Sequence, residues 1–320
     1  MISRDSAEGA TDGPAAIVLT KEERRRGIYA PETLGKVLSA LHQDGLVLLK
    51  GIIDVGHIDA INSKMCEEVE HFLADPKQAF NHGIKSNFLQ RPPVAEPSLL
   101  FEDVYFNTFL LQVANAYLGH KPIFNWITSN NALANTGGVR QPVHKDNAFV
   151  HPQFPYYFIA NIPLCDFSVA NGATEFWLGS HSHTSQADQL KATGKDLDIY
   201  PHSKLGEPIP GITEEALKVR RAVRPPVQPE CHKGDVMIRD IRTWHAGMAN
   251  GSDMHRIMIG LGYMSPSYPN FLQRCHLPES QRPFWLGSDK VELRANFWDD
   301  EEFKKTKRDS EFLLRPTYLC

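Results

Sequence analysis

Long apolar runs are absent from this 320-residue sequence. A membrane-spanning helix needs roughly 20 consecutive apolar residues, and no stretch of the chain approaches that length. The N-terminus also lacks the apolar centre of a secretory signal. We therefore expect a soluble protein that stays in the cytoplasm.

Cysteine is scarce, and its spacing excludes two kinds of site. The five cysteines are widely separated, and none belongs to a Cys-x-x-Cys pair. This pattern argues against a disulfide framework and against a thiolate zinc site. A reducing compartment is consistent with it. Because cysteine is commonly a small buried side chain, we expect none of these thiols to be catalytic.

An excess of one charge is missing as well. The chain has 34 Lys and Arg against 38 Asp and Glu, which gives a formal net charge of −4. Because the two signs are interspersed, we expect no cationic face for nucleic acid or for a membrane surface. A small-molecule partner is the expectation, and a homodimer is left open. With 42% apolar residues, the chain should fold around a substantial core.

The chain divides into a helical N-terminal part and a strand-rich core. Residues 1–20 show no apolar period, so we expect a flexible arm there. Apolar residues recur every three or four positions over 34–41, 58–69 and 104–118, which predicts helices, and 46–49 reads as a buried strand. After 120 the pattern predicts short strands at 122–135, 140–147, 156–167, 172–179, 235–248 and 255–265.

The order of these elements predicts the fold class. Strands follow the helices in bulk instead of alternating with them, which favours an antiparallel jelly roll over a parallel sheet. A charged run at 299–308 predicts a solvated helix near the end of the chain. We expect a single domain over 21–320, composed of a helical part 31–119, a jelly-roll core 120–265 with a polar insertion at 181–230, and a C-terminal extension 266–320.

Two histidines and a carboxylate form the candidate metal site. His144 and Asp146 are two positions apart in an extended segment, so their side chains should share one face. His245 precedes the pair Asn250-Gly251, which favours a two-residue hairpin loop. In that hairpin His245 would lie directly opposite Arg256, and both side chains would point to the same side.

Such a set predicts iron chemistry. Two imidazoles and one carboxylate on one side of an ion leave positions open on the other, as in non-haem iron(II) oxygenases. A 2-oxo acid can chelate there, and its distal carboxylate needs a cation such as the guanidinium of Arg256. A zinc-dependent hydrolase or isomerase on the same ligands and a jelly-roll binding protein without catalysis remain as alternatives. Considered one at a time, side chains such as His144, Asp146, His245 and Arg256 more often have a structural role than a functional one.

The segments around these positions resemble the phytanoyl-CoA dioxygenase family. The likeness covers about 38–265 and is carried by 141–146, 171–181 and 240–256, with a weaker match over 38–51. It implies a double-stranded β-helix, which is the cupin-like jelly roll. It also implies roles for seven side chains, the iron(II) ligands His144, Asp146 and His245 and the 2-oxoglutarate contacts Arg256, Gln141, Thr174 and Gln90.

The resemblance further implies an activity. The protein would be a dioxygenase that uses iron(II), 2-oxoglutarate and O₂ to oxidise a C–H bond, with release of succinate and CO₂. Hydroxylation is the expected outcome, and desaturation or cyclisation needs only a different placement of the substrate. The substrate is expected to be a small, largely apolar metabolite of secondary metabolism.

Overall fold

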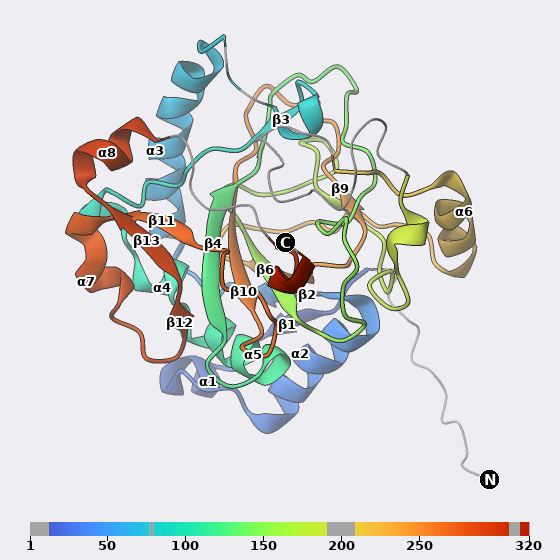
Figure 1. Ribbon diagram of the computed structural model, residues 1–320, viewed down its shortest axis with the longest axis horizontal. Helices are drawn as coiled ribbons and strands as arrows, with labels where there is room; N and C mark the ends of the chain where they lie inside the picture. The colour runs from blue at the N-terminus through green and yellow to red at the C-terminus, as the bar shows by residue number, and fades with distance from the viewer. Residues whose placement is uncertain (1–12, 77, 79, 191–208, 307–313, 320) are drawn as a thin grey trace.

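A seven-stranded sheet lies at the centre of the protein (Figure 1). The computed structural model describes residues 13–76, 78, 80–190, 209–306 and 314–319. The sheet's inner strands pair antiparallel and its two edge strands pair parallel with their neighbours. In spatial order the strands are β1 (Ala16–Val18), β2 (Leu46–Lys50), β8 (Val236–Asp240), β6 (Tyr157–Pro163), β10 (Met258–Met264), β4 (Ile123–Ser129) and β12 (Glu292–Leu293).

Short strand pairs form a second layer. β7 (Glu175–Phe176) pairs antiparallel with β9 (His245–Ala246), and a further bridge joins β9 to His144. β3 (Asn87–Phe88) pairs antiparallel with β5 (Asn131–Ala132), which is bridged to Arg256. A cavity lined by residues of both layers lies between them, so the predicted jelly roll is confirmed.

The inner strands present two different faces because successive side chains on a strand point to opposite sides. In β10, Ile259, Leu261 and Tyr263 are buried in the main hydrophobic core. Met258 and Gly260, on the other face, line the cavity between the layers. β6 and β8 alternate in the same way, so each strand contributes one face to the core and the other to the cavity.

Helices cover the core face of the sheet. α2 (Pro31–Asp44) and α5 (Thr108–Leu118) pack there (Figure 1), and α3 (Val55–Leu73) contributes four buried apolar residues to the same core. α2 begins at a proline and ends at Gly45 in the left-handed conformation, with φ 70°. A side chain at Gly45 would also collide with Thr243 and His181. Both the backbone conformation and the lack of space therefore require glycine at this position.

The remaining elements surround this framework. In the part of the chain that the structure describes, no helix combines the length and the apolar character needed to span a bilayer. The other α-helices and β-strands of the described residues are α1 (Lys21–Arg26), α4 (Glu102–Tyr105), α6 (Glu214–Val223), α7 (Arg282–Trp285), α8 (Asp300–Lys305), β11 (Cys275–Pro278) and β13 (Ala295–Trp298).

Several boundaries differ from those predicted. The flexible arm expected over 1–20 does not hold for Ala16–Val18, which form β1 beside β2, and 1–12 lie outside the described residues. The expected strand 140–147 reduces to the bridge at His144. The insertion 181–230 contains α6, and its residues 191–208 lie outside the described part. The predicted helix in 299–308 is confirmed as α8.

Candidate metal centre

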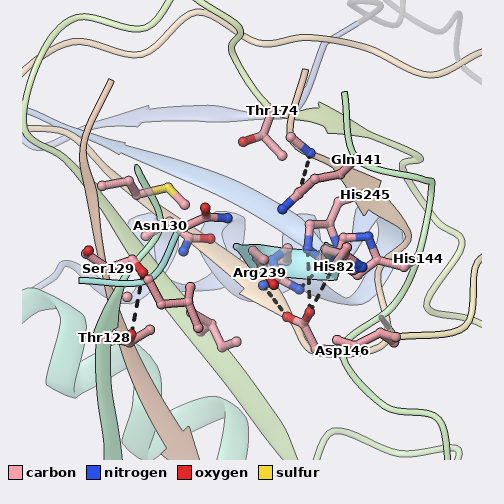
Figure 2. Close-up of a pocket in the computed structure, with 18 of the residues that line it drawn as sticks. His82, Thr128, Ser129, Asn130, Gln141, His144, Asp146, Thr174, Arg239 and His245 are labelled. Atoms are coloured by element: carbon pink, nitrogen blue, oxygen red, sulfur yellow. Dashed lines mark hydrogen bonds and ion pairs between the residues drawn. The ribbon is translucent and has the colours of Figure 1, made fainter. Parts of the chain in front are cut away.

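Three side chains converge at one end of the cavity (Figure 2). Oδ1 of Asp146 lies 3.6 Å from Nε2 of His144 and 3.7 Å from Nε2 of His245. All three potential ligand atoms are within 4.8 Å of one another. The backbone brings them together, because His144 and His245 donate to each other's carbonyl oxygens at 3.0 and 2.9 Å. An ion of the size of iron or zinc could contact all three.

Both imidazoles are prepared to bind a metal through Nε2. Nδ1 of His144 donates to the carbonyl of Pro142 at 2.8 Å, and Nδ1 of His245 donates to that of Thr243 at 3.1 Å. Because a carbonyl only accepts, each Nδ1 carries the proton and each Nε2 keeps its lone pair. Burial lowers the pKa of His144 to about 3 and that of His245 to about 4. Neutral imidazole is the form that ligates metals.

The carboxylate of Asp146 is held ionised. Burial alone would raise its pKa, but the positive charge of Arg239 holds that pKa well below its usual range. Nη2 of Arg239 donates to Oδ2 of Asp146 at 2.6 Å. The two oxygens of Asp146 therefore have different neighbours, with Oδ1 beside the histidines and Oδ2 paired with the guanidinium.

The cavity beside these residues has a volume of about 120 Å³ and walls of mixed character. Apolar surface comes from Trp126, Ile159, Phe176 and Met258, and hydrogen-bonding groups come from Thr128, Ser129, Asn130 and Asn161. Most of these side chains project from the cavity faces of β4, β6 and β10. A ligand beside the metal position would meet both kinds of wall.

The guanidinium of Arg256 is buried and has no hydrogen-bond partner in the part of the chain that the structure describes. Its side chain is 1% exposed, and neither Nε nor either Nη has a partner among the described residues. Burial lowers its pKa to about 10, so it is charged at neutral pH. Its guanidinium lies 4.4 Å above the ring of Phe167. Because a buried charge is costly unless it is paired, an anionic ligand bound beside this guanidinium would offset the cost of its burial.

The predicted hairpin register is wrong. His245 pairs with His144 and with Phe176 of β7, whereas Arg256 pairs with Ala132. A type I′ turn needs positive φ at both central residues, and neither Asn250 nor Gly251 has it. Instead Asn250 closes a longer loop, accepting from the backbone of Ser252 and donating to the carbonyl of Met254.

Arg256 nevertheless lies on the cavity side of its strand. It precedes the cavity-lining residue Met258 by two positions in a continuous extended segment, so the two share a face. Arg256 itself does not line the cavity; its ring partner Phe167 belongs to the same apolar cluster as Phe176 and Met258. Arg256 therefore shares a strand face with a cavity-lining residue, through a strand pairing that differs from the expected one.

The three remaining predicted contacts have different placements. Gln141 and Thr174 both line the cavity. Oε1 of Gln141 accepts from the backbone of Gly247 at 2.7 Å, while its Nε2 is buried without a partner among the described residues. Gln90 lies outside the cavity, and its amide is already bonded to Met65, Glu68 and Asn131. A cosubstrate contact by Gln90 is therefore not supported.

Two side chains of the site were missed in the sequence. Arg239 is a charged residue that directly follows three apolar positions of the buried strand β8, which is the signal that could have identified it. His82 lies in an irregular segment, where no periodic pattern marks it. Its ring centroid is 4.2 Å from that of His144, its two ring nitrogens are buried without partners in the described structure, and its φ is 57°. His82 thus lies at the cavity wall beside a predicted ligand.

These residues suit an iron ion with a dianionic chelator. The neutral imidazoles and the ionised Asp146 form a facial set of ligands. The guanidinium of Arg256 and the amide nitrogen of Gln141, which have no partner within the described ranges, are donors that an acidic ligand would satisfy.

Comparisons with known proteins agree with this geometry. The family model for phytanoyl-CoA dioxygenase (PhyH) matches residues 41–258, more than half of the chain. The iron/alpha-ketoglutarate-dependent dioxygenase ausO of Aspergillus calidoustus is 26% identical over 241 residues, which are 69% of this chain and 69% of that protein.

Solved structures share the fold at low sequence identity. AviO1 from Streptomyces viridochromogenes Tue57 has a TM-score of 0.52 at 17% identity, covering 76% of this chain and 99% of its own. The epimerase SnoN, solved with Fe³⁺, alpha ketoglutarate and nogalamycin RO, has a TM-score of 0.52 at 17% identity, covering 85% of this chain and 98% of its own. These likenesses establish the architecture.

Proposed function

The chain belongs to the phytanoyl-CoA dioxygenase family and is an iron- and 2-oxoglutarate-dependent oxygenase, in which we propose that His144, Asp146 and His245 bind iron(II). The observation that carries this proposal is the convergence of the three ligand atoms within 4.8 Å of one another. Because they occupy one side of the ion position, the opposite side stays open toward the cavity.

Arg256 is the proposed partner of the distal carboxylate of 2-oxoglutarate. The burial of its guanidinium without a hydrogen-bonding partner among the described residues supports this role, because a guanidinium binds a carboxylate through two parallel hydrogen bonds. Gln141 and Thr174, which line the cavity, are proposed to contact the same cosubstrate. When bound, iron(II) with 2-oxoglutarate and O₂ supplies the oxidising power that breaks a C–H bond, leaving succinate and CO₂.

The protein's own contribution is to position a small molecule and to exclude water. The apolar walls at Trp126, Phe176 and Met258 support a largely apolar substrate. Asn161 adds a buried amide to the same wall, so the substrate is proposed to carry at least one polar group. We propose that this metabolite belongs to secondary metabolism and that the enzyme acts in the cytoplasm. A homodimer is a further proposal.

The ligand assignment is tested by anaerobic titration of the purified protein with Fe(II), followed by 2-oxoglutarate. We expect wild type to bind both and to form succinate in air, and His144→Ala and His245→Ala to lose iron binding. His71→Ala is the control, because His71 is exposed on α3. Unchanged iron content in both histidine variants would refute the assignment. Tightly bound zinc without succinate formation would instead favour the hydrolase or isomerase alternative, and no turnover with any metal would favour a binding protein.

A further inference from the structure

We propose that Arg239 is a positioning residue that reserves one oxygen of Asp146, so that the carboxylate meets the metal through Oδ1 alone and 2-oxoglutarate finds its coordination positions open. This inference rests on the proposed function. It assigns a role to a residue that neither ligates the metal nor binds the distal carboxylate of the cosubstrate.

The geometry around Arg239 is specific. It lies in β8, where it pairs with Leu46 of β2 on one side and Ile159 of β6 on the other, and its side chain is nearly completely buried at the cavity wall. Nη2 donates to Oδ2 of Asp146 at 2.6 Å. Figure 2 shows the guanidinium and the two imidazoles approaching Asp146 from different directions.

Among the described residues, Asp146 is the one strong partner of this guanidinium. Nη1 lies 3.5 Å from Nδ1 of His245, at the outer limit for a hydrogen bond. That Nδ1 proton already points to the carbonyl of Thr243, and Nε of Arg239 has no partner among the described residues. The cation is therefore placed to hold Oδ2 of Asp146 rather than to support the surrounding fold.

The contact between Arg239 and Asp146 matters because the metal ion has a limited number of coordination positions. A carboxylate can bind a metal through one oxygen or through both. In an octahedral site, two imidazoles and one carboxylate oxygen leave three positions, enough for a two-oxygen chelator and O₂. A second oxygen from Asp146 would take one of them. By occupying Oδ2, Arg239 keeps the chelator and O₂ from competing for the same positions.

The charge of Arg239 acts in the same direction. A buried guanidinium next to a metal site repels the divalent cation and attracts a dianion. It therefore weakens metal binding alone and strengthens 2-oxoglutarate binding to the metal-loaded protein. Because binding free energies are reciprocal, the cosubstrate should also raise the affinity for the metal.

The test is a pair of anaerobic calorimetric titrations of the full-length protein and of Arg239→Gln. Fe(II) is titrated first without 2-oxoglutarate, and 2-oxoglutarate is then titrated into the iron-loaded protein. We expect the iron affinity of the variant to be unchanged or up to about tenfold tighter, and its 2-oxoglutarate affinity to be at least about tenfold weaker. The visible absorption of the iron–2-oxoglutarate complex should change in the variant as well, because the coordination of Asp146 has changed.

Two further variants keep the test decisive. Arg239→Lys retains the positive charge, so its 2-oxoglutarate affinity should lie nearer to that of wild type, and it serves if Arg239→Gln fails to fold. Arg242→Lys is the matched control, because Arg242 is a buried arginine three positions away that pairs with Asp240 outside the cavity. It should leave 2-oxoglutarate affinity unchanged.

The outcomes distinguish a failure of the proposed role of Arg239 from a failure of the proposed function. A parallel loss of iron and 2-oxoglutarate affinity in Arg239→Gln would indicate a merely structural role and overturn the proposal. Unchanged affinities for both ligands would overturn it too. If wild type itself shows no iron-dependent binding of 2-oxoglutarate, the proposed function fails first, and the role of Arg239 fails with it.

Discussion

Replacing Arg256 with methionine should separate the stability of the free protein from its affinity for the cosubstrate. The guanidinium is buried and has no hydrogen-bond partner among the described residues. Its pKa is lowered by burial to about 10, below that of arginine in an unfolded chain. Folding therefore carries a cost below pH 10 that is relieved only as the pH rises further. At neutral pH the full cost is present.

Methionine removes this cost and fills a similar space over Phe167. Replacing buried charges with apolar residues is often neutral or stabilising by about 1–4 kcal/mol. We therefore expect the ligand-free variant to be as stable as wild type or more stable by about 1 kcal/mol. Loss of the charged hydrogen bonds to 2-oxoglutarate should cost about 3 kcal/mol, which corresponds to an affinity at least about 100-fold lower.

Unfolding in urea, with and without iron and 2-oxoglutarate, measures both effects. At a 2-oxoglutarate concentration of about 100 Kd, the wild type should gain about 2.7 kcal/mol, whereas the variant should gain about 0.4 kcal/mol. Arg91→Met is the matched control, because Arg91 also stacks on a phenylalanine but donates to two backbone carbonyls. A variant that binds 2-oxoglutarate like wild type, or that is destabilised without ligand, would refute this reasoning.

Three other expectations follow from the site. Because His144 and His245 are neutral at pH 7, iron binding should release far less than one proton per ion, which calorimetry in buffers of different ionisation enthalpy measures. His82→Asn should keep the iron affinity of wild type, since the ligand set is complete without it; a 100-fold loss would make His82 a fourth ligand. Burial lowers the pKa of Lys145 to about 7, so between pH 7 and 10.5 the unfolded chain holds a proton that the folded chain has released. Stability should therefore rise with pH across this window by up to about 1.4 kcal/mol per unit, and urea unfolding of Lys145→Met should show a flatter dependence.

Local patterns predicted the parts of the structure that local forces determine. The period of apolar residues identified α2 and α3, and short segments bounded by Gly, Asn and Pro identified β6 and β10. The two-residue spacing of His144 and Asp146 predicted that their side chains lie close together, which the structure confirms. These features need no knowledge of which segments lie side by side.

Pairing between distant segments was predicted less well. Asn250-Gly251 favours a tight hairpin locally. In the jelly roll, however, β9 and β10 lie in different layers and pair with other strands. The side chain of Asn250 then stabilises a longer loop. The contact between Arg239 and Asp146 spans 93 positions, and no local pattern indicates its partner.

The two-faced strands have a consequence for divergence among related enzymes. On β10 the residues that pack in the core and those that line the cavity alternate, so they occupy different positions in the sequence. Gly260 illustrates this, since a methyl group added there would reach ordinary contact distance, 3.4 Å or more, from Trp126 and Ile159 without entering the core. Substrate preference can therefore be altered one residue at a time while the scaffold is conserved.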